Sequence, residues 1–567
     1  MSSETEQQQD VEKQPASAST EASVVTDTSV SEAAPKSDSE PTGGVDQVSR
    51  NSALMSVLVI ISRLTGFMRT WGQAYAIGVT VMASCYSVAN NLPELLYELV
   101  AAGMLTTAFL PVYMSVKKRA GTKGANEYTS NLVSLALIVM IAVTILGFIF
   151  AEPLVYTQSF SATEEFDFDL TVYFFRFFVI DVVLYTLSSI FSGVLNAERD
   201  YLWSTAAPIF NNIVTTISFF AYAALADTNP SLALIILAVG NPLGVGIQVV
   251  MQIPSMLKHG IRLHWRVDIH DPDLRDTLKI GIPSLVVMIA NFIVTSVQSS
   301  SVLSVDATGA SIAYYARLWY TLPYAILTVP ITTTMFTELS DSWSRGDTDA
   351  FKNGINSGLR QILFFMLPFM MYLMVFSIPL ISIMAGDSFT EAQIITTAEY
   401  LSVYALSLPL YGVCMYFQKV CSSMREMKLY AAASVAGTVL QVWLMLSFTT
   451  TFGLNFVPFT ILPFYIVVDS IILISLRRKL GHFGLRGTLI SALKSFVLGL
   501  LGAIAGALVL YGLTNAFGSC MASPLLAFVY TVAGGIVSLI VTYGLAFVIK
   551  MPETSIIKGL VKKATKR

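Results

Sequence analysis

The stretch that decides the fold reads SVLVIISRLTGFMRTWGQAYAIG (residues 56–78) and then, after a short turn, CYSVANNLPELLYELVAAGMLTTAFLPVYMSV (residues 85–116). Both segments are long and apolar enough to cross a bilayer, which takes about 20 residues of helix. Two such segments in succession predict a pair of neighbouring membrane helices.

Both segments carry charges where a membrane helix normally has none. Arg63 and Arg69 lie within the first, and Glu94 and Glu98 lie within the second. An ionisable side chain at the centre of a bilayer costs about 3 kcal/mol, and it is tolerated where it faces a water-filled cavity or another charge. We therefore expect this stretch to line a polar cavity within the membrane, with the rest of the chain forming its walls.

Composition places the whole chain in the class of polytopic membrane proteins. The sequence has 567 residues, of which 54% are hydrophobic and only 13% charged, and its mean hydropathy is +0.66. A soluble protein would carry about 25% charged residues. The four cysteines and four histidines show no disulfide or metal-ligand spacing, so we expect neither a metal site nor a cofactor.

Apolar runs of spanning length follow one another from residue 53 to the end and predict an all-α fold with fourteen transmembrane helices. The predicted spans are 54–80, 82–115, 128–153, 169–196, 202–226, 230–256, 277–303, 308–336, 355–384, 393–422, 428–450, 455–477, 488–514 and 522–550.

Basic residues alternate along the loops and predict the orientation. They follow the second, sixth, eighth, tenth and twelfth spans and close the chain, as in KKRAGTK after the second span. The intervening loops, such as TQSFSATEEFDFD and GDSFTEA, contain no Lys or Arg. Cytoplasmic loops are enriched in these residues. Both termini are therefore predicted to be cytoplasmic, which agrees with an even number of spans.

Two local resemblances share an offset of about 230 residues and predict an internal repeat. NLPELLYELVAAG (from residue 91) resembles TLPYAILTVPITT (from residue 321), and SGVLNAERDYLW (from residue 192) resembles KVCSSMREMKLY (from residue 419). Parallel repeats related by an axis along the membrane normal are a known transporter plan. We expect an N-terminal lobe at 50–256, a C-terminal lobe at 257–480 and two further helices at 481–550.

Low-complexity sequence flanks these predicted lobes. Residues 1–49 are acidic and rich in Ser, Glu, Gln, Ala and Thr, so we expect a disordered cytoplasmic tail. Residues 551–567 are predicted to form a short basic cytoplasmic tail.

The polar side chains of four predicted helices point to one central site. Arg63 and Arg69 are about 240° apart on an ideal helix, and Gly66 between them is a candidate hinge that would turn both toward one cavity. The other candidates form stripes at steps of three and four residues or stand among tyrosines. The predicted site comprises Arg63, Arg69, Asn90, Asn91, Glu94, Glu98, Asn291, Gln298 and Arg317.

Several arginines in such a site favour an anionic ligand, because a guanidinium group matches phosphate geometry and stays charged. The alternative is that Arg63 and Arg69 only pair with Glu94 and Glu98 and so hold two helices together. We expect structural pairing or interfacial positions for the remaining charges within spans, which are Arg176, Asp181, Glu399, Lys419 and Asp469.

No motif for enzymatic catalysis is present. The sequence has no GxxxxGK[ST], HExxH or GxSxG pattern. The chain is therefore not expected to be an enzyme or to hydrolyse ATP.

At SRLTGFMR (residues 62–69), NLPELL…AAGMLTTAFLPVY and SGVLNAERDYLWSTAAPIFNNIV (residues 192–214), the chain resembles the MurJ (MviN) family of bacterial lipid II flippases. This family belongs to the multidrug, oligosaccharide-lipid and polysaccharide exporter superfamily. The resemblance covers essentially all of residues 53–550.

The resemblance implies two six-helix lobes around a cationic cavity that opens alternately to each side of the cytoplasmic membrane. It implies that the last two helices form a groove for a polyprenyl tail, and that the cargo is the lipid-linked disaccharide-pentapeptide of peptidoglycan. By this resemblance Arg63 and Arg69 would contact the pyrophosphate. Its implied partners are a lipid-linked cell-wall precursor, membrane lipids and cell-wall synthesis or division proteins, with no nucleic acid.

The chain departs from the family pattern mainly in the second span. Tyr97 and Glu98 stand where the family has paired arginines, and Ala102 and Ser84 replace acidic residues. In the eighth span, Arg317 lies one position earlier than the basic residue of the family's ADRL. The predicted cavity is therefore less cationic than is typical.

These departures keep other functions open beside lipid II flipping. One is export of another polyprenyl-linked oligosaccharide, or of drugs by cation antiport with Glu94 and Glu98 as carriers. Another is a non-transporting scaffold for cell-wall synthesis, with the acidic tail as a docking arm.

Overall fold

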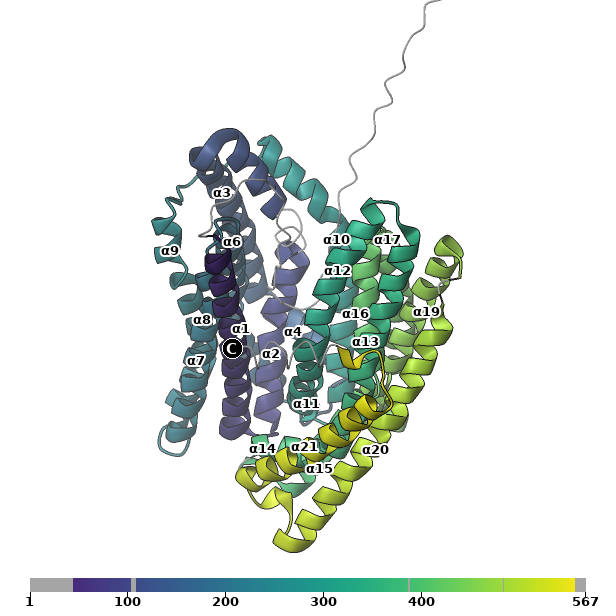
Figure 1. Cartoon of the computed structure of the whole chain (residues 1–567). Helices are drawn as coiled ribbons and strands as arrows, with labels where there is room; N and C mark the ends of the chain where they lie inside the picture. The colour runs from purple at the N-terminus through teal and green to yellow at the C-terminus, as the bar shows by residue number, and fades with distance from the viewer. Residues whose placement is uncertain (1–43, 103–108, 386–387, 483, 556–567) are drawn as a thin grey trace, which may run out of the picture.

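The computed structural model describes residues 44–102, 109–385, 388–482 and 484–555, with side chains omitted at 44–57, 101–102, 276 and 278–284. Within these ranges the chain is a bundle of long helices (Figure 1). Residues 1–43 of the predicted N-terminal tail, the motif residues 103–108 and residues 556–567 of the basic tail lie outside the description.

The helices of the first half are α1 (Gly44–Ile77), α2 (Val81–Tyr97), η1 (Glu98–Ala102), α3 (Leu110–Ile149), α4 (Ala151–Ser159), α5 (Phe168–Phe178), α6 (Asp181–Ala197), α7 (Tyr201–Leu225), α8 (Pro230–Val250) and α9 (Ile253–Lys258). Helix α1 begins at Gly44, so the predicted tail of residues 1–49 extends too far. Residues 44–50 contain no proline that would interrupt the helix.

The second half contains α10 (Pro272–Leu303), α11 (Gly309–Pro323), η3 (Tyr324–Thr328), α12 (Val329–Ser344), α13 (Thr348–Val375), α14 (Ser377–Ala385), α15 (Glu391–Ala405), α16 (Leu408–Ser423), α17 (Met427–Phe452), α18 (Phe456–Phe459) and α19 (Ile461–Leu480). The chain then forms α20 (Leu485–Phe517), η5 (Cys520–Ala522) and α21 (Pro524–Val548).

Several helices begin at a polar residue that caps the first turn. Asn229, Asp271 and Ser523 each accept a hydrogen bond from a backbone N–H of the first turn, and a proline follows each of them. A capping side chain satisfies an otherwise unpaired N–H group, and proline is favoured at the first helical position because it needs no hydrogen-bond acceptor there.

The helical membrane fold is confirmed, whereas the count of fourteen spans stays a prediction. In the described part of the chain ten helices are long and apolar enough to cross a membrane, or eleven if the bent pair α15–α16 forms one span. The predicted spans 54–80, 82–115 and 308–336 are not among them. Each of these three carries charged residues, and the last two contain prolines and breaks in the α-helix.

Special backbone features recur at a constant separation along the two halves. The π-helical turns η1 and η3 begin at Glu98 and Tyr324, and left-handed residues occur at Arg199 (φ 60°) and Arg425 (φ 59°). Each pair is 226 residues apart (98 to 324 and 199 to 425). Non-glycine residues rarely adopt this conformation, so its recurrence reflects the same turn built twice.

Each of these left-handed turns is tethered to the helix that ends its half. Asp200 accepts a hydrogen bond from Ser255 of α9, and Glu426 accepts one from Lys479 of α19. We therefore propose that residues 50–256 and 257–480 are parallel six-helix lobes and that 481–550 is an addition to them.

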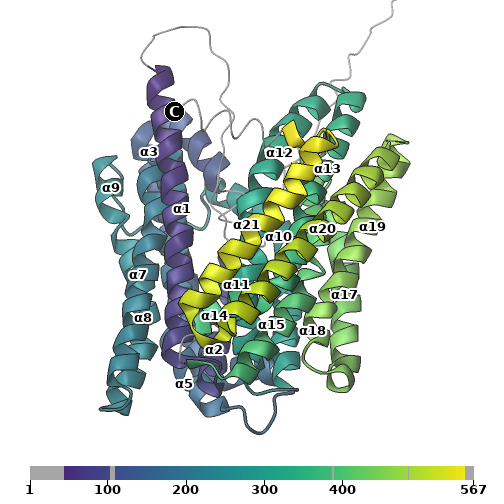
Figure 2. The ribbon, with the colours of Figure 1, turned by 60° about the horizontal axis from the view of Figure 1, so that its bottom comes forward.

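The two halves lie side by side and are joined at one end. Figures 1 and 2 place α1, α3 and α6–α9 on one side and α12, α13, α17 and α19 on the other, with α2 and α11 between them. Hydrogen bonds connect the α1–α2 turn to the second half: Tyr315 Oη to Gly78 O (2.9 Å), Ser311 N to Ser84 Oγ (3.1 Å), Gln393 Nε2 to Val79 O (2.7 Å) and Ser388 Oγ to Tyr75 O.

Gly78 is required at this junction for two reasons. Its φ is +57°, and a Cβ atom there would lie 2.5 Å from the carbonyl oxygen of Ser388. The close approach of the two halves therefore depends on a residue without a side chain.

Helices α20 and α21 pack against each other and, through α13 and α14, against the second half, which they cross diagonally in Figure 2. Small buried residues line the contact between them, including Gly502 and Gly506 of α20 and Gly534, Ser538 and Thr542 of α21. Small residues let membrane helices approach closely, so that their backbones come into contact.

Replacing Gly502 with alanine should destabilise this contact, because the new Cβ would lie 2.7 Å from the carbonyl oxygen of Ser538. We expect a loss of about 1–3 kcal/mol, as for other overpacked sites, seen as a lower melting temperature of the purified protein in detergent. Gly512→Ala is the matched control on the same helix, since nothing lies within 4 Å of its Cβ position. Equal melting temperatures for the two variants would contradict this account.

Candidate functional site

The site begins with Arg69 in α1, whose guanidinium group is held from two other helices. Arg69 Nη2 donates a hydrogen bond to Asn241 Oδ1 of α8 (2.8 Å), and Asn241 Nδ2 donates to Asp181 Oδ2 of α6 (2.7 Å). Asn241 and Asp181 are both fully buried. The neutral amide of Asn241 therefore lies between the guanidinium group of Arg69 and the carboxyl group of Asp181 and is hydrogen-bonded to both.

This chain of side chains has unused hydrogen-bonding capacity. Arg69 Nε and Asp181 Oδ1 are buried, and neither has a partner within the described residues. A buried polar atom without a partner is costly, and in a native structure it calls for an explanation such as a ligand or an ordered water. Arg69 itself is half-buried, so part of its side chain is accessible.

The second component is a pair of carboxylates around the break in the second span. Glu94 lies near the end of α2, and Glu98 begins the π-helical turn η1. Asn291 Nδ2 of α10 donates a hydrogen bond to Glu98 Oε2 (3.0 Å). Single π-helical turns within α-helices occur frequently at functional sites. Here the turn positions one carboxylate against the other half of the molecule.

Arg317 of α11 brings the second half into the site. It interacts electrostatically with Glu94 and Glu98, and Glu94 also interacts with Arg69. Arg317 is surrounded by protein on many sides and nevertheless remains exposed. This combination is expected for a side chain on the wall of an interior, solvent-accessible space.

A cluster of tyrosines adjoins Arg317. The rings of Tyr320 and Tyr404 stack with centroids 3.8 Å apart, and those of Tyr324 and Tyr411 are 4.4 Å apart. Tyr404 and Tyr411 interact electrostatically with Arg317. Aromatic faces can accept a guanidinium group by cation–π contact or by stacking.

The arrangement is therefore a mixed-charge site with arginines from both halves. Arg69 and Arg317 supply donors that suit a multivalent oxyanion, while Glu94 and Glu98 lie within their electrostatic range. Among the described side chains Arg69 forms no ion pair with either glutamate. The predicted pairing of Arg69 with Glu94 or Glu98 as a direct structural link between the first two helices is thus wrong for this residue.

The remaining predicted site residues occupy less central positions. Arg63 is exposed on α1, while Asn90 and Asn91 are half-buried on α2. Gln298 lies beside Tyr400 of α15. Helix α1 continues through Gly66 without a break, and the role of Gly66 as a hinge stays a prediction.

Sequence reasoning missed the importance of Asp181 and Asn241. We expected structural pairing or an interfacial position for Asp181, and the structure links it to Arg69 through Asn241, a residue that was not among the predicted ones. The nearby Arg176 instead pairs with Glu152 (3.3 Å). The available signal was that Asp181 and Asn241 are single strongly polar residues within long apolar runs, where each needs a partner.

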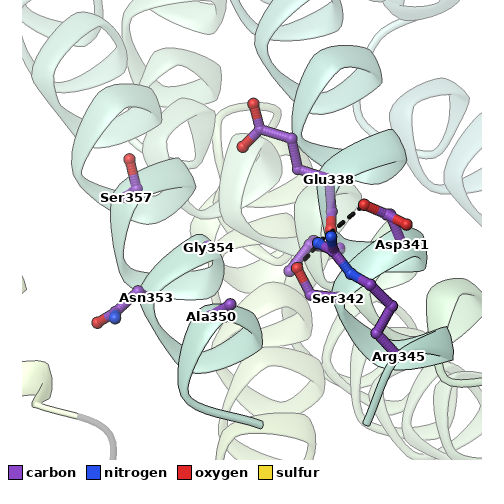
Figure 3. A pocket seen from close by; sticks show the side chains of 9 residues that line it. Glu338, Asp341, Ser342, Arg345, Ala350, Asn353, Gly354 and Ser357 are labelled. Atoms are coloured by element: carbon purple, nitrogen blue, oxygen red, sulfur yellow. Dashed lines mark hydrogen bonds and ion pairs between the residues drawn. The ribbon is translucent and has the colours of Figure 1, made fainter. Parts of the chain in front are cut away.

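The structure also contains a peripheral cavity of about 440 Å³ between the end of α12 and the start of α13. Figure 3 shows its lining, in which Arg345 pairs with Asp341 (2.9 Å) beside the exposed Glu338. Its carboxylates make it acidic, and its residues are distinct from those of the central site. Within the described residues no group of three or more His, Cys, Asp or Glu side chains is placed to hold a metal ion.

Comparison with solved structures identifies the fold. The chain is similar to a structure titled "Lipid II flippase MurJ, inward closed conformation", with a TM-score of 0.71 and 21% identity over 88% of this chain and 100% of that chain. It is also similar to a multidrug resistance MATE family transporter in an inward-facing conformation, with a TM-score of 0.62 and 14% identity over 75% of this chain and 94% of that one.

Comparison with protein sequences identifies the family. The family described as "Lipid II flippase MurJ" matches residues 73–528. The chain is 26% identical over 376 residues to the probable lipid II flippase MurJ of Buchnera aphidicola subsp. Acyrthosiphon pisum, which covers 65% of this chain and 71% of that protein. It is 25% identical over 372 residues to the lipid II flippase MurJ of Burkholderia cenocepacia; the aligned region covers 63% of this chain and 70% of that protein. Because the family match extends over most of the sequence, this chain belongs to the lipid II flippase MurJ family.

Proposed function

We propose that this protein translocates lipid II, the lipid-linked precursor of peptidoglycan, across the bacterial cytoplasmic membrane by alternating access. The observation that supports the proposal is that Arg69 and Arg317, from opposite halves of a MurJ family member, both interact electrostatically with Glu94. The activity moves an amphiphile and makes or breaks no covalent bond.

Recognition of the cargo would centre on its pyrophosphate. A guanidinium group donates two parallel hydrogen bonds to phosphate oxygens, and it stays charged at all physiological pH values. Arg69 donates a hydrogen bond to Asn241, so the protein itself fixes the orientation of the guanidinium group. Preorganisation of this kind lowers the entropic cost of binding.

Glu94 and Glu98 would adjust how tightly the cargo is held. Both carboxylates lie within electrostatic range of Arg317, and therefore compete with an anionic ligand for the same positive charge. A transporter must release what it binds. Exchange between the carboxylates and the pyrophosphate would keep the charge of the arginines balanced in both the loaded and the empty states.

The contacts between the halves support a gate at the end where α1 meets α2. Side chain–backbone hydrogen bonds join that turn to α11 and α15. The loops predicted to lie at this end are free of Lys and Arg, which supports a gate on the extracytoplasmic side under the positive-inside rule. Opening would require these hydrogen bonds to break, together with those that join the segment between α4 and α5 to α10, such as Ser161 N to Ser300 Oγ (2.8 Å) and Thr163 N to Leu303 O (3.0 Å).

The cytoplasmic assignments form part of the same proposal. Both termini would face the cytoplasm, where the acidic N-terminal and basic C-terminal tails are available to proteins of cell-wall synthesis or division. The membrane potential would drive the cycle, since moving one charge through 100 mV is worth about 2.3 kcal/mol.

Replacing Arg69 with alanine should lower lipid II translocation about 10- to 100-fold at subsaturating substrate. Charge-assisted hydrogen bonds contribute about 1.5–3 kcal/mol, and each 1.4 kcal/mol is about tenfold in rate. The measurement is exposure of lipid II on the outer face of proteoliposomes, normalised to folded protein. Arg176→Ala is the control, because Arg176 forms an exposed ion pair with Glu152. Unchanged transport by Arg69→Ala would refute the proposed role.

Asn241→Leu should impair translocation through Arg69 itself. We expect a loss of several-fold in the wild-type background and little further loss when Arg69→Ala is already present. A double-mutant cycle measures this coupling, which reaches about 0.5–3 kcal/mol for residues in contact. A purely structural role for Asn241 would instead give additive losses, in step with the melting temperatures of the variants.

Crosslinking the junction should stop transport reversibly. The Ser388 hydroxyl group contacts the carbonyl oxygen of Tyr75 across the two halves. In a Tyr75→Cys/Ser388→Cys variant, a short bifunctional methanethiosulfonate should abolish lipid II translocation, and a reductant should restore it. Tyr75→Cys alone and Ser388→Cys alone, treated in the same way, should each keep their activity. Full transport by the crosslinked double variant would contradict a gate at this end.

A further inference from the structure

A second polar cavity lies at the periphery of the first half, where the turn between α6 and α7 meets α9. Its volume is about 570 Å³, and its lining includes Arg199, Trp203, Lys258 and His259. Figures 1 and 2 both place α9 at the edge of the molecule remote from α19. None of the residues of the central site contributes to this cavity.

Glu198, the residue before Arg199, is paired with side chains of α3 and not with groups of the cavity. Glu198 accepts hydrogen bonds from Lys117 Nζ (2.5 Å) and Tyr113 Oη (2.7 Å) of α3. Its carboxylate is therefore already paired within the protein, and it is not a lining residue.

The second acidic neighbour, Asp200, is also engaged. Its carboxylate accepts a hydrogen bond from Ser255 Oγ and lies 3.8 Å from His259 Nδ1. These contacts fix Asp200 to α9 on the wall of the cavity. Both acidic residues of this turn are thus engaged by other side chains of the protein.

The positive charges of the cavity are not balanced in this way. Arg199 and Lys258 are exposed, and no hydrogen bond or ion pair within the described chain involves either side chain. The left-handed backbone of Arg199 recurs at Arg425. The conformation therefore belongs to the repeated turn, and what distinguishes the first turn is its setting beside Lys258 and Trp203.

Exposed apolar side chains adjoin this cationic cavity: Leu202 lines it, and Ile253 and Leu257 lie on α9 next to lining residues. Leu202 is 39% exposed, Ile253 38% and Leu257 58%, and Trp203 stacks on Phe210. Tryptophan with Lys or Arg at a helix end is typical of the membrane–water interface. A ligand held here would have a charged group on the cations and an apolar part along the neighbouring helices.

We propose that this cavity binds the phosphate group of an anionic phospholipid at the cytoplasmic face of the membrane. Arg and Lys are the side chains that suit phosphate oxygens, and basic pockets between membrane helices on the cytoplasmic side bind anionic headgroups. The lipid would hold α9 to the α6–α7 turn from outside the transport site. The acidic cavity beside Glu338 offers no comparable site for an anion.

The test is binding of dihexanoyl phosphatidylglycerol to the purified full-length protein in a non-ionic detergent, with dihexanoyl phosphatidylcholine as the matched zwitterionic probe. The phosphatidylglycerol should bind at least tenfold more tightly. Arg199→Glu/Lys258→Glu should remove that preference, and Arg425→Glu, at the equivalent turn of the second half, should keep it. Lys258→Gln, a milder change at an exposed position, should weaken phosphatidylglycerol binding alone.

Three outcomes would overturn the proposal. The first is equal affinity of the wild-type protein for the two lipids. The second is an equal loss in the double variant and in Arg425→Glu, because this would show a non-specific effect of charge. The third is displacement of the lipid by inorganic phosphate at comparable concentrations, which would assign the cavity to free phosphate instead. Melting temperatures without lipid identify any variant that is unfolded, and Lys258→Gln then decides.

Discussion

The site depends on a hydrogen-bonded path from Arg69 through Asn241 to Asp181, which joins α1, α8 and α6 inside an apolar interior. Neither charge could be kept there alone, because an unpaired buried ion costs several kcal/mol even after the protein relaxes. The intervening amide gives each group one hydrogen-bond partner without bringing the two groups into direct contact. Arg69 is therefore stabilised in position but is not fully neutralised, and its charge remains available to an anionic ligand.

The second half contributes a different kind of environment. Arg317 stands on the wall of the interior space with stacked tyrosines behind it and two carboxylates of the first half within electrostatic range. The two arginines are thus supported by unlike surroundings, one by a buried polar path and the other by aromatic faces. Since the halves are hydrogen-bonded through the α1–α2 turn, a change in their relative position would alter both the Arg69–Arg317 separation and the distance of Arg317 from the two carboxylates.

The sequence predicts the class, the family and the charged residues of the site, because charges within apolar runs are conspicuous. The helical fold and the family are confirmed, whereas SRLTGFMR lies before residue 73, where the family match begins. It does not predict the contact of Arg69 with Asn241, which joins residues 172 positions apart. No local pattern records such a pairing, since a single Asn in an apolar helix has no periodic partner. The span count stays open for a related reason: the charges and prolines of the site lower the apparent hydropathy of the helices that build it.

The two π-helical turns have a mechanical consequence. Each adds one residue to a helical turn immediately after α2 and α11, the helices that lie between the halves. If such a turn reverts to α-helix, the segment beyond it rotates by about 100° and shifts by about 1.5 Å relative to the segment before it. Side chains such as Glu98 would then be re-aimed while α2 keeps its packing. Glu94 and Arg317 lie before these two turns and Glu98 is the first residue of one of them, so such a change would reorient the segments beyond the turns relative to the charged residues of the site.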